Sequence, residues 1–288
     1  MTNSIVSPPP RIQAPARPLL AGPVYHLVVS NTAADIEAAQ RLRYRVFAEE
    51  PGFGSAMSAV TDGRDADRFD EHCDHILVRH NLTEEVVGCY RMLPPPGAAA
   101  TGGLYTATEF DLGELAGFAS QTVEMGRACV ESAHRSGSVM ALMWAGILRY
   151  LDATGYRYVL GCTSVPVCAD VDDVPGATIR GVRDLVRNRH RAPWQAFPYR
   201  HVVIDGRRLD DIEPPAAVVV PGLLRGYLRL GAQICGEPAH DIDFGVGDFV
   251  TVLDKTAANQ RYLQRLRSAA DAAQRYDPAQ RYDPAQLG

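Results

Sequence analysis

Hydrophobic and polar residues along this chain follow a strand-like pattern in some segments and a helix-like pattern in others. Apolar runs of strand length stand at 25–30, 74–79 and 85–93, and the last two predict a hairpin across a short polar connection. Between the first two runs, Asn31 and Thr32 are typical caps of a helix, which the spacing of Ile36, Ala39 and Leu42 predicts over 33–47. The composition predicts loops at 50–66 and 94–103 and a short helix at 108–115.

The centre of the chain has the clearest pattern. A strand at 121–130 is followed by a strongly apolar helix at 138–153 and a further strand at 156–163, a unit long enough for a parallel crossover. The remaining elements are predicted at 178–191 (a basic helix), 201–204, 223–230 and 249–253. Strands first and a βαβ unit next predict an α/β fold with a single mixed central sheet flanked by helices.

Composition and charge narrow the class of protein. The 288 residues carry a formal net charge of −5, which argues against a dedicated nucleic-acid-binding protein. We expect a Pro-rich, disordered leader at 1–23, one catalytic domain at 24–255 and a helical, then disordered tail at 256–288, where the hexapeptide RYDPAQ occurs twice. No secretory pattern or membrane-spanning apolar run is evident in the sequence, so we expect a cytoplasmic location.

Two charged residues interrupt the central apolar strand at 121–130. Glu124 and Arg127 are three residues apart and would point to opposite faces of a regular strand, but a bulge near Gly126 would turn both toward one cleft. Charges in such a strand are costly unless they are satisfied, so they indicate either a reaction site or a structural ion pair. Arg135 and Gly137 then precede a helix N-terminus, which suits a phosphate but is also ordinary turn chemistry.

An acidic and histidine-rich stretch at 65–75 favours amine binding over metal binding. On a strand, His72 and Asp74 face one way while Cys73 and His75 face the other, so the four cannot converge on a metal ion, and we expect none. Carboxylates that attract a cationic amine fit the stretch better. Cys129 is flanked by apolar residues, which favours a buried, inert thiol over a nucleophile.

Taken in order, the motifs resemble those of a known family. They are LRYRVF, DEHCDH, VVGCYRML, YTATEFDL, VEMGRACV, YVLGCTS and a late block containing GEPAHDIDFGVGDF. This succession, over about residues 38–254, is similar to the GNAT-type N-acyltransferases that acylate ornithine for ornithine-lipid synthesis. A more distant likeness runs to acyl-homoserine lactone synthases, whose shared framework falls on Arg45, Phe47, Asp67, Asp70, Arg91, Glu124 and Arg127.

The resemblance implies a GNAT-like fold and amide formation between an amino acid's α-amine and a (3-hydroxy)acyl thioester. It implies Glu124 as the base, with Arg127 orienting it or binding the substrate carboxylate. For substrate binding it implies Asp70, Glu71 and Asp74, braced by Arg45 and Arg91, and for the acyl donor Ala128, Cys129, Val130, Arg135 and Gly137.

The donor implied is a co-substrate rather than a tightly bound cofactor. The family's pyrophosphate loop reads His134-x-x-Gly137-x-Val139 here, a departure that favours acyl carrier protein over acyl-CoA. Met140, Met143 and Trp144 either line an acyl groove or belong to the helix core.

Two other functions stay open at this stage. One is a synthase of acyl-amino-acid or acyl-homoserine signals, and the other is a non-catalytic module that binds acyl carrier protein or membrane. Arginines at 180, 183, 187, 189 and 191, followed by Trp194 and Phe197, fit either a solvated helix face or peripheral contact with the inner membrane face or an acidic carrier.

Overall fold

The computed structural model describes residues 18–49, 60–135, 137–168 and 173–274. The leader up to residue 17, residues 50–59 of the predicted loop and the RYDPAQ repeat lie outside the described residues.

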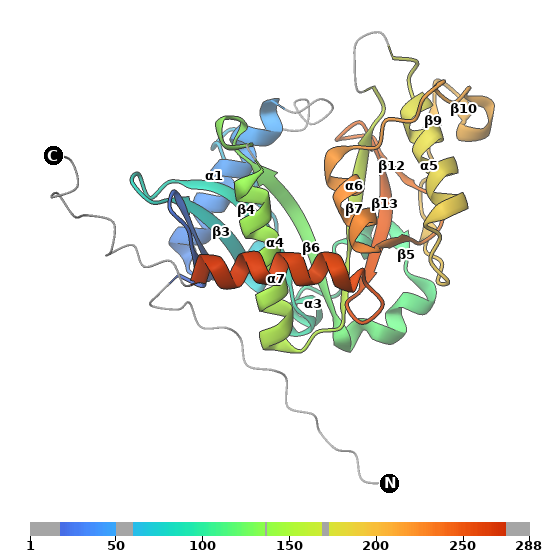
Figure 1. Ribbon diagram of the computed structural model, residues 1–288. Coiled ribbons are helices and arrows are strands. Elements are labelled where there is room, and N and C mark those ends of the chain that lie inside the picture. Colours follow the sequence, from blue (N-terminus) through green and yellow to red (C-terminus); the bar gives the residue numbers. More distant parts are fainter. Residues whose placement is uncertain (1–17, 50–59, 136, 169–172, 275–288) are drawn as a thin grey trace, which may run out of the picture.

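A nine-stranded mixed sheet forms the centre of the molecule (Figure 1), in the order β1-β2-β3-β4-β6-β7-β13-β11, with β12 also paired to β13. The strands are β1 (Leu20–Ala21), β2 (Tyr25–Ser30), β3 (Asp74–His80), β4 (Val86–Leu93), β6 (Thr122–Val130), β7 (Tyr158–Pro166), β11 (Gln233–Ile234), β12 (Ala239–Asp241) and β13 (Val246–Asp254). The pair β3–β4 is antiparallel and β6–β7 is parallel, which confirms the predicted hairpin and crossover. Two small sheets, β5 (Phe110–Asp111) with β8 (Phe197–Pro198) and β9 (Val203–Ile204) with β10 (Arg207–Arg208), flank it.

Helices cover both faces of this sheet. They are α1 (Ala33–Glu49), α3 (Pro95–Ala100), α4 (Ser138–Thr154), α5 (Ala177–Arg189), α6 (Gly222–Leu230) and α7 (Gln260–Gln274). The apolar side of α1 packs on Leu77 and Cys89, whereas α4 and α7 pack on the opposite face, against Ile76 and Tyr90. This alternation follows from the two-residue period of strands β3 and β4.

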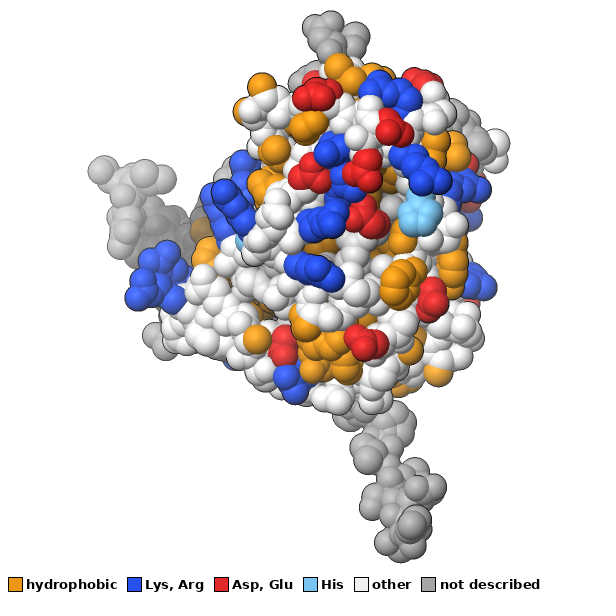
Figure 2. Space-filling view, turned by 90° about the vertical axis from the view of Figure 1, so that its right-hand side faces the viewer, with side chains coloured by type: hydrophobic (Ala, Val, Ile, Leu, Met, Phe, Trp, Pro, Cys, Tyr) orange, Lys and Arg blue, Asp and Glu red, His pale blue; other side chains and the backbone are white. Residues whose placement is uncertain are grey.

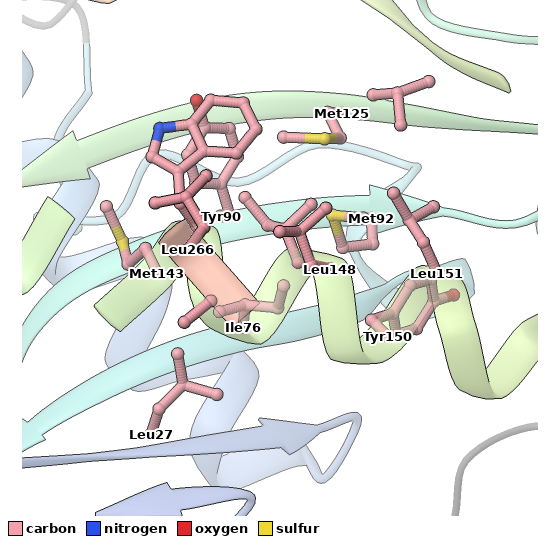
Figure 3. Packing of buried hydrophobic residues seen from close by; sticks show 14 of the residues in the cluster. Leu27, Ile76, Tyr90, Met92, Met125, Met143, Leu148, Tyr150, Leu151 and Leu266 are labelled. Carbon is pink, nitrogen blue, oxygen red and sulfur yellow. The ribbon is translucent and has the colours of Figure 1, made fainter. Parts of the chain in front are cut away.

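The largest hydrophobic core lies between the sheet and α4 (Figure 3). Leu27, Ile76 and Met92 from the strands face Met143 and Leu148 of α4, and Leu266 of α7 closes the same cluster. Each of the fully buried aliphatic side chains contributes about 1.5–3 kcal/mol relative to exposure. This core holds the left half of the sheet in Figure 1 as a firm support for β6.

Three segments differ from the sequence-based expectation. The Pro-rich connection at 94–103 contains α3, because proline is compatible with the first turn of a helix. The helix predicted at 108–115 is instead the 3₁₀ turn Thr106–Thr108, strand β5 and the 3₁₀ helix Gly113–Gln121. Strand β1 brings Leu20 of the expected leader into the core, where its side chain is 1% exposed.

Candidate active site

The parallel strands β6 and β7 separate after a short paired stretch. Each has nine residues, but only Thr122–Glu124 and Tyr158–Leu160 are paired. Gly161 follows the last pair, at a point where a Cβ atom would lie 2.2 Å from the carbonyl oxygen of Met125, so no larger residue fits that approach. Beyond it the strands diverge, as Figure 1 shows, and a cavity of about 830 Å³ lies between them.

A β-bulge shapes the β6 wall of this cavity. On β4, Cys89 and Arg91 pair with Cys129 and Gly126, so the single residue between them on β4 stands opposite Arg127 and Ala128 on β6. Arg127 takes a left-handed backbone conformation, with φ +51°. The predicted bulge is therefore confirmed, and Glu124 and Arg127 both line the cavity although they are three residues apart.

The Glu124 carboxylate is buried and receives hydrogen bonds from one turn. The backbone N–H groups of Tyr105 and Thr106 donate to it at 2.6 and 2.7 Å, and the Thr106 hydroxyl donates at 2.5 Å. Burial raises the pKa of Glu124 above its usual value even though these three bonds favour the carboxylate. Glu124 therefore fixes the Thr106–Thr108 turn and presents a carboxylate with a raised proton affinity to the cavity.

Behind the bulge lies a network of six charged residues with three positive and three negative members, which we call the balanced network: Arg43, Arg91, Arg127, Asp65, Asp67 and Asp70. Arg43 binds Asp65 and Asp70, each at 2.8 Å. Arg91 binds Asp67 at 2.6 Å and Asp70 at 3.1 Å, while the Nε of Arg127 lies 3.3 Å from Asp65.

The other members of the balanced network hold the Arg127 side chain in place. Burial opposes ionisation of Asp70, but the hydrogen bond from Arg43 and the charges of Arg43 and Arg91 hold its pKa well below the usual range. The guanidinium of Arg127 also lies over the rings of Tyr105 and Phe244, at 5.3 and 5.5 Å from their centroids. The side chain is thus fixed from three sides at the cavity wall.

The opposite wall carries three acidic residues, Glu109, Asp241 and Asp248, which we call the acidic triad. Their carboxyl oxygens lie within 4.8 Å of one another, and Asp241 and Asp248 line the cavity. Ser164 donates a hydrogen bond of 2.6 Å to Asp248. Burial, and then the charges of Asp248 and Asp241, raise the pKa of Glu109 to about 9; burial and the charge of Asp241 raise that of Asp248 to about 6.

Four of the predicted substrate-binding residues lie away from the cavity. Asp70 is 1% exposed within the balanced network, and Asp74 accepts a hydrogen bond from Tyr150 on the α4 side of the sheet. Glu71 is exposed on the 3₁₀ turn Asp70–His72. Arg45 pairs with Glu131 at the surface instead of bracing Asp70. These four side chains do not converge in the structure, because Arg45 lies on α1, Asp70 and Glu71 lie on a 3₁₀ turn, and Asp74 lies on β3 with its side chain on the α4 face.

The residues predicted for the acyl donor lie around the other end of the cavity. Ala128, Cys129, Val130 and Arg135 line it, as does Met140, whereas Met143 and Trp144 belong to the core. Gly137 precedes α4 with φ +89° and has open space where a Cβ atom would be. Across the cavity, Tyr90 of β4 and Tyr227 of α6 share a short hydrogen bond between their hydroxyl groups.

Sequence reasoning missed Arg43, Tyr227 and the acidic triad. A signal for Arg43 exists, because it falls on the same apolar arc of α1 as Ile36, Leu42 and Val46, about 200° from Arg45 at 100° per residue. A signal for Asp248 is its position inside the apolar strand VGDFVTVLD. Glu109 and Tyr227 come from segments whose positions depend on long-range packing, so local pattern contains no comparable signal.

The basic helix predicted at 178–191 is largely neutralised. Arg183 is buried and binds Asp184, Asp210 and Glu237, and Arg180 binds Asp184. Figure 2, which looks onto this side of the molecule, shows basic and acidic side chains interleaved there. A continuous basic face is therefore not present on α5.

A comparison with known protein families agrees with this arrangement, in which β6 carries a bulge and separates from β7. A model described as an acetyltransferase (GNAT) domain matches residues 42–145, from α1 into α4. A solved structure of the CoA-dependent acyl-homoserine lactone synthase BjaI with SAM and isopentyl-CoA covers 87% of this chain and 90% of its own, with 16% identity and a TM-score of 0.48. The matched segment agrees with the GNAT-like α/β fold that the sequence resemblance implies.

Curated relatives narrow the class further. An L-ornithine N(alpha)-acyltransferase of Brucella abortus is 33% identical over 82% of this chain and 86% of the relative. One of Rhizobium meliloti is 34% identical over 82% of this chain and 81% of the relative. The chain belongs to the L-ornithine N(alpha)-acyltransferase family.

Proposed function

We propose that the protein transfers a (3-hydroxy)fatty acyl group from a phosphopantetheine thioester to the α-amine of ornithine. The observation that carries the proposal is the cavity between β6 and β7, whose two walls complement the two substrates. The bulge of β6 and Arg135 line one wall, and Asp241 and Asp248 line the other. The names of the curated relatives, L-ornithine N(alpha)-acyltransferases, support ornithine as the acceptor.

The acidic triad supports binding of the side-chain ammonium of ornithine. An ammonium group has three N–H donors, and the triad offers three carboxyl groups at matching spacing. One oxygen of Glu109 is buried and has no hydrogen-bond partner among the described residues. Three carboxyl groups are fewer than the six or more oxygen ligands that Mg²⁺ or Ca²⁺ prefers, and burial raises the pKa of Glu109 to about 9, so this carboxyl group is protonated at neutral pH. We therefore assign it to an organic cation.

The β6 wall then receives the other end of the amino acid. Arg127 presents a guanidinium that can bind the substrate carboxylate as a fork. With the two ends held, the α-amine lies between Arg127 and the acidic triad, near Glu124. We assign Glu124 as the base that takes the ammonium proton through a water molecule, because its raised pKa increases its proton affinity.

The donor thioester is assigned to the splayed edge of β6. The free amine attacks the thioester carbonyl, the oxyanion accepts hydrogen bonds from backbone N–H groups of Ala128–Val130, and the thiol leaves with a proton. We assign the pantetheine phosphate to Arg135, which lines the cavity, and to the start of α4 at Gly137. Acyl carrier protein is the proposed donor, since the departure at His134-x-x-Gly137-x-Val139 weakens a nucleotide pyrophosphate site.

The test is an acyl-transfer assay with purified full-length protein. Ornithine and a 3-hydroxyacyl carrier protein should give N-acylornithine by mass spectrometry, and acyl-CoA of the same chain should react more slowly. Lysine, glycine and S-adenosylmethionine serve as alternative acceptors, of which lysine differs from ornithine by one methylene. Product from S-adenosylmethionine alone would instead support a signal synthase, and no product from any acceptor would support a binding module.

The base is tested separately with Glu124→Gln. We expect a decrease in kcat of about 10²–10⁴-fold with little change in KM for ornithine. Because Glu124 also fixes the Thr106–Thr108 turn, Thr106→Val is the matched control: it removes one of the three hydrogen bonds and keeps the carboxylate. Undiminished product from Glu124→Gln would contradict the assignment.

We further propose a cytoplasmic location with peripheral contact at the inner membrane face. Within the described residues, no helix combines the length and apolar character needed to cross a bilayer. Since Arg180 and Arg183 are already paired, we assign the contact to Arg187 and Arg189 at the end of α5.

A further inference from the structure

Two cysteines face each other on neighbouring strands beside the bulge. Cys89 of β4 is the register partner of Cys129 of β6, and their Sγ atoms are 3.5 Å apart. Both thiols are buried, but Cys129 lines the cavity and Cys89 lies behind it. The pair therefore has one member within reach of a small molecule and a second in contact with the first.

We propose that Cys89 and Cys129 are a reversible oxidative modification site that forms a cross-strand disulfide and lowers acyl transfer. The co-reactant is a low-molecular-weight disulfide of the glutathione class. Cys129 attacks one of its sulfurs, which forms a mixed disulfide and releases one thiol. Cys89 then attacks Sγ of Cys129 and releases the second thiol, so two cysteine protons end on the two released thiols.

The surroundings favour the second step of this exchange. Only thiolate attacks a disulfide, and the hydrogen bond between the two sulfurs, with the charge of Arg43 nearby, lowers the pKa of Cys89, the thiol that closes the bond, whereas burial raises the pKa of Cys129 and slows the first step. Register partners on adjacent strands also have Cα separations compatible with disulfide geometry. Neither strand has to move out of the sheet for the bond to form.

Oxidation should act on catalysis through the bulge. A disulfide bond is about 2.05 Å long, so the two sulfurs approach by roughly 1.5 Å. Cys129 follows Ala128, and the Cys89 thiol donates to the carbonyl of Arg127 at 3.6 Å. Closing the pair therefore shifts the backbone of the proposed oxyanion site, which should reduce kcat more than KM for ornithine.

The test compares reduced and oxidised full-length protein. After incubation with oxidised glutathione and alkylation of free thiols, trypsin should give a linked pair of peptides, residues 80–91 and 128–135, that dithiothreitol separates. We expect kcat to fall at least fivefold on oxidation and to recover on reduction, with an increase in Tm of about 5 °C or more in the oxidised form.

Two variants distinguish this site from general thiol damage. Cys89→Ala leaves the cavity lining unchanged but cannot close the cross-strand bond, so oxidised glutathione should leave a glutathione adduct on residues 128–135 and no linked peptides, whereas Cys168→Ser, at an exposed cysteine, should form the linked pair and lose activity as the parent protein does. The proposal is overturned if Cys89 and Cys129 stay free under these conditions, or if the disulfide forms with unchanged kcat. Peptide linkage is read by mass alone, so it is independent of the proposed substrate.

Discussion

The two walls of the cavity contain clusters of charge that differ in balance. Behind β6, three arginines meet three aspartates, and each carboxylate has a cationic partner within the protein. On the β13 side, the acidic triad has three carboxyl groups, and the pKa values of Glu109 and Asp248 are raised. A cluster that is neutral by itself serves to hold its members in place, whereas one with unmatched charge is complete only when a ligand supplies the opposite charge.

The largest effect should come from breaking the balanced network. Arg43→Met leaves Asp65 and Asp70 without their buried partner, and we expect the free energy of unfolding to fall by about 3–5 kcal/mol. Arg45→Met, two residues along the same helix, removes an exposed pair with Glu131 and should cost less than about 1 kcal/mol. Denaturant unfolding of both proteins checks the difference; equal losses would contradict a structural role for the network.

Removing a charge from the acidic triad should instead weaken substrate binding and leave stability almost unchanged. Asp248→Asn keeps the size of the side chain and its contact with Ser164 but removes a charge, so we expect KM for ornithine to rise by about 10–100-fold. Stability should change by less than about 1 kcal/mol, because burial already disfavours the ionised form. Asp254→Asn, at the end of the same strand, is the control and should leave KM unchanged. A stability loss as large as that of Arg43→Met would make the triad structural.

The pH dependence should separate the two clusters as well. The pKa of Asp248 is raised to about 6, so the carboxylate gains a proton below that pH and loses its attraction for a cation. We expect KM for ornithine to rise about tenfold between pH 7 and pH 5 in the parent protein and much less in Asp248→Asn. A flat profile in the parent protein would be evidence against ammonium binding at the triad.

The same raised pKa values also make the stability of the unliganded protein depend on pH, and stability falls as pH rises whereas ornithine binding improves. Because the folded, unliganded protein binds protons at Glu109 and Asp248 more tightly than the unfolded chain does, the stability that these groups contribute is present at acidic pH and is lost as pH rises through about 6 and about 9. Ornithine should offset this loss, so its effect on Tm should grow from pH 5 to pH 8. Thermal scans with and without ornithine measure the difference.

The smallest effect concerns α5, where Arg183 is paired with acidic residues and Arg187 is assigned to membrane contact. Arg187→Glu removes one positive charge and adds a negative one, so it should weaken binding to anionic vesicles by at least fivefold, the effect of a single surface charge at about 1 kcal/mol, with no loss of stability. Arg183→Glu should instead destabilise the fold, because it places a carboxylate beside Asp210 and Glu237. Vesicle co-sedimentation together with thermal unfolding distinguishes the two, and unaltered vesicle binding of Arg187→Glu would exclude the proposed contact.

Local pattern sufficed for the elements whose partners are close in sequence. The hairpin β3–β4 and the crossover from β6 to β7 follow from apolar periodicity, and the bulge follows from the placement of Gly126 between two charged residues. The 3₁₀ turn Thr106–Thr108 does not, because it is fixed by hydrogen bonds from Tyr105 and Thr106 to the carboxylate of Glu124, which is distant in sequence.

The part of the site whose residues are close in sequence was predicted, and the rest was not. Glu124, Arg127 and Arg135 lie on one continuous stretch of chain, so the sequence indicates their proximity. The acidic triad combines Glu109 with Asp241 and Asp248, more than 100 positions later, and the pairing of β12 with β13 brings the last two together. The wrong choice of Arg45 rather than Arg43 has a different cause. Helical periodicity places Arg43 on the buried face of α1 and Arg45 on the exposed face, so the sequence contained the information needed to choose between them.

The short parallel pairing of β6 and β7 has a mechanical consequence. Only three residue pairs join the two halves of the sheet there, whereas β7 and β13 are paired along nine positions. Main-chain hydrogen bonds therefore contribute little to this junction, and side chains such as Val159 of β7 and Leu253 of β13, which belong to the same core cluster as those of α4, hold the two halves together.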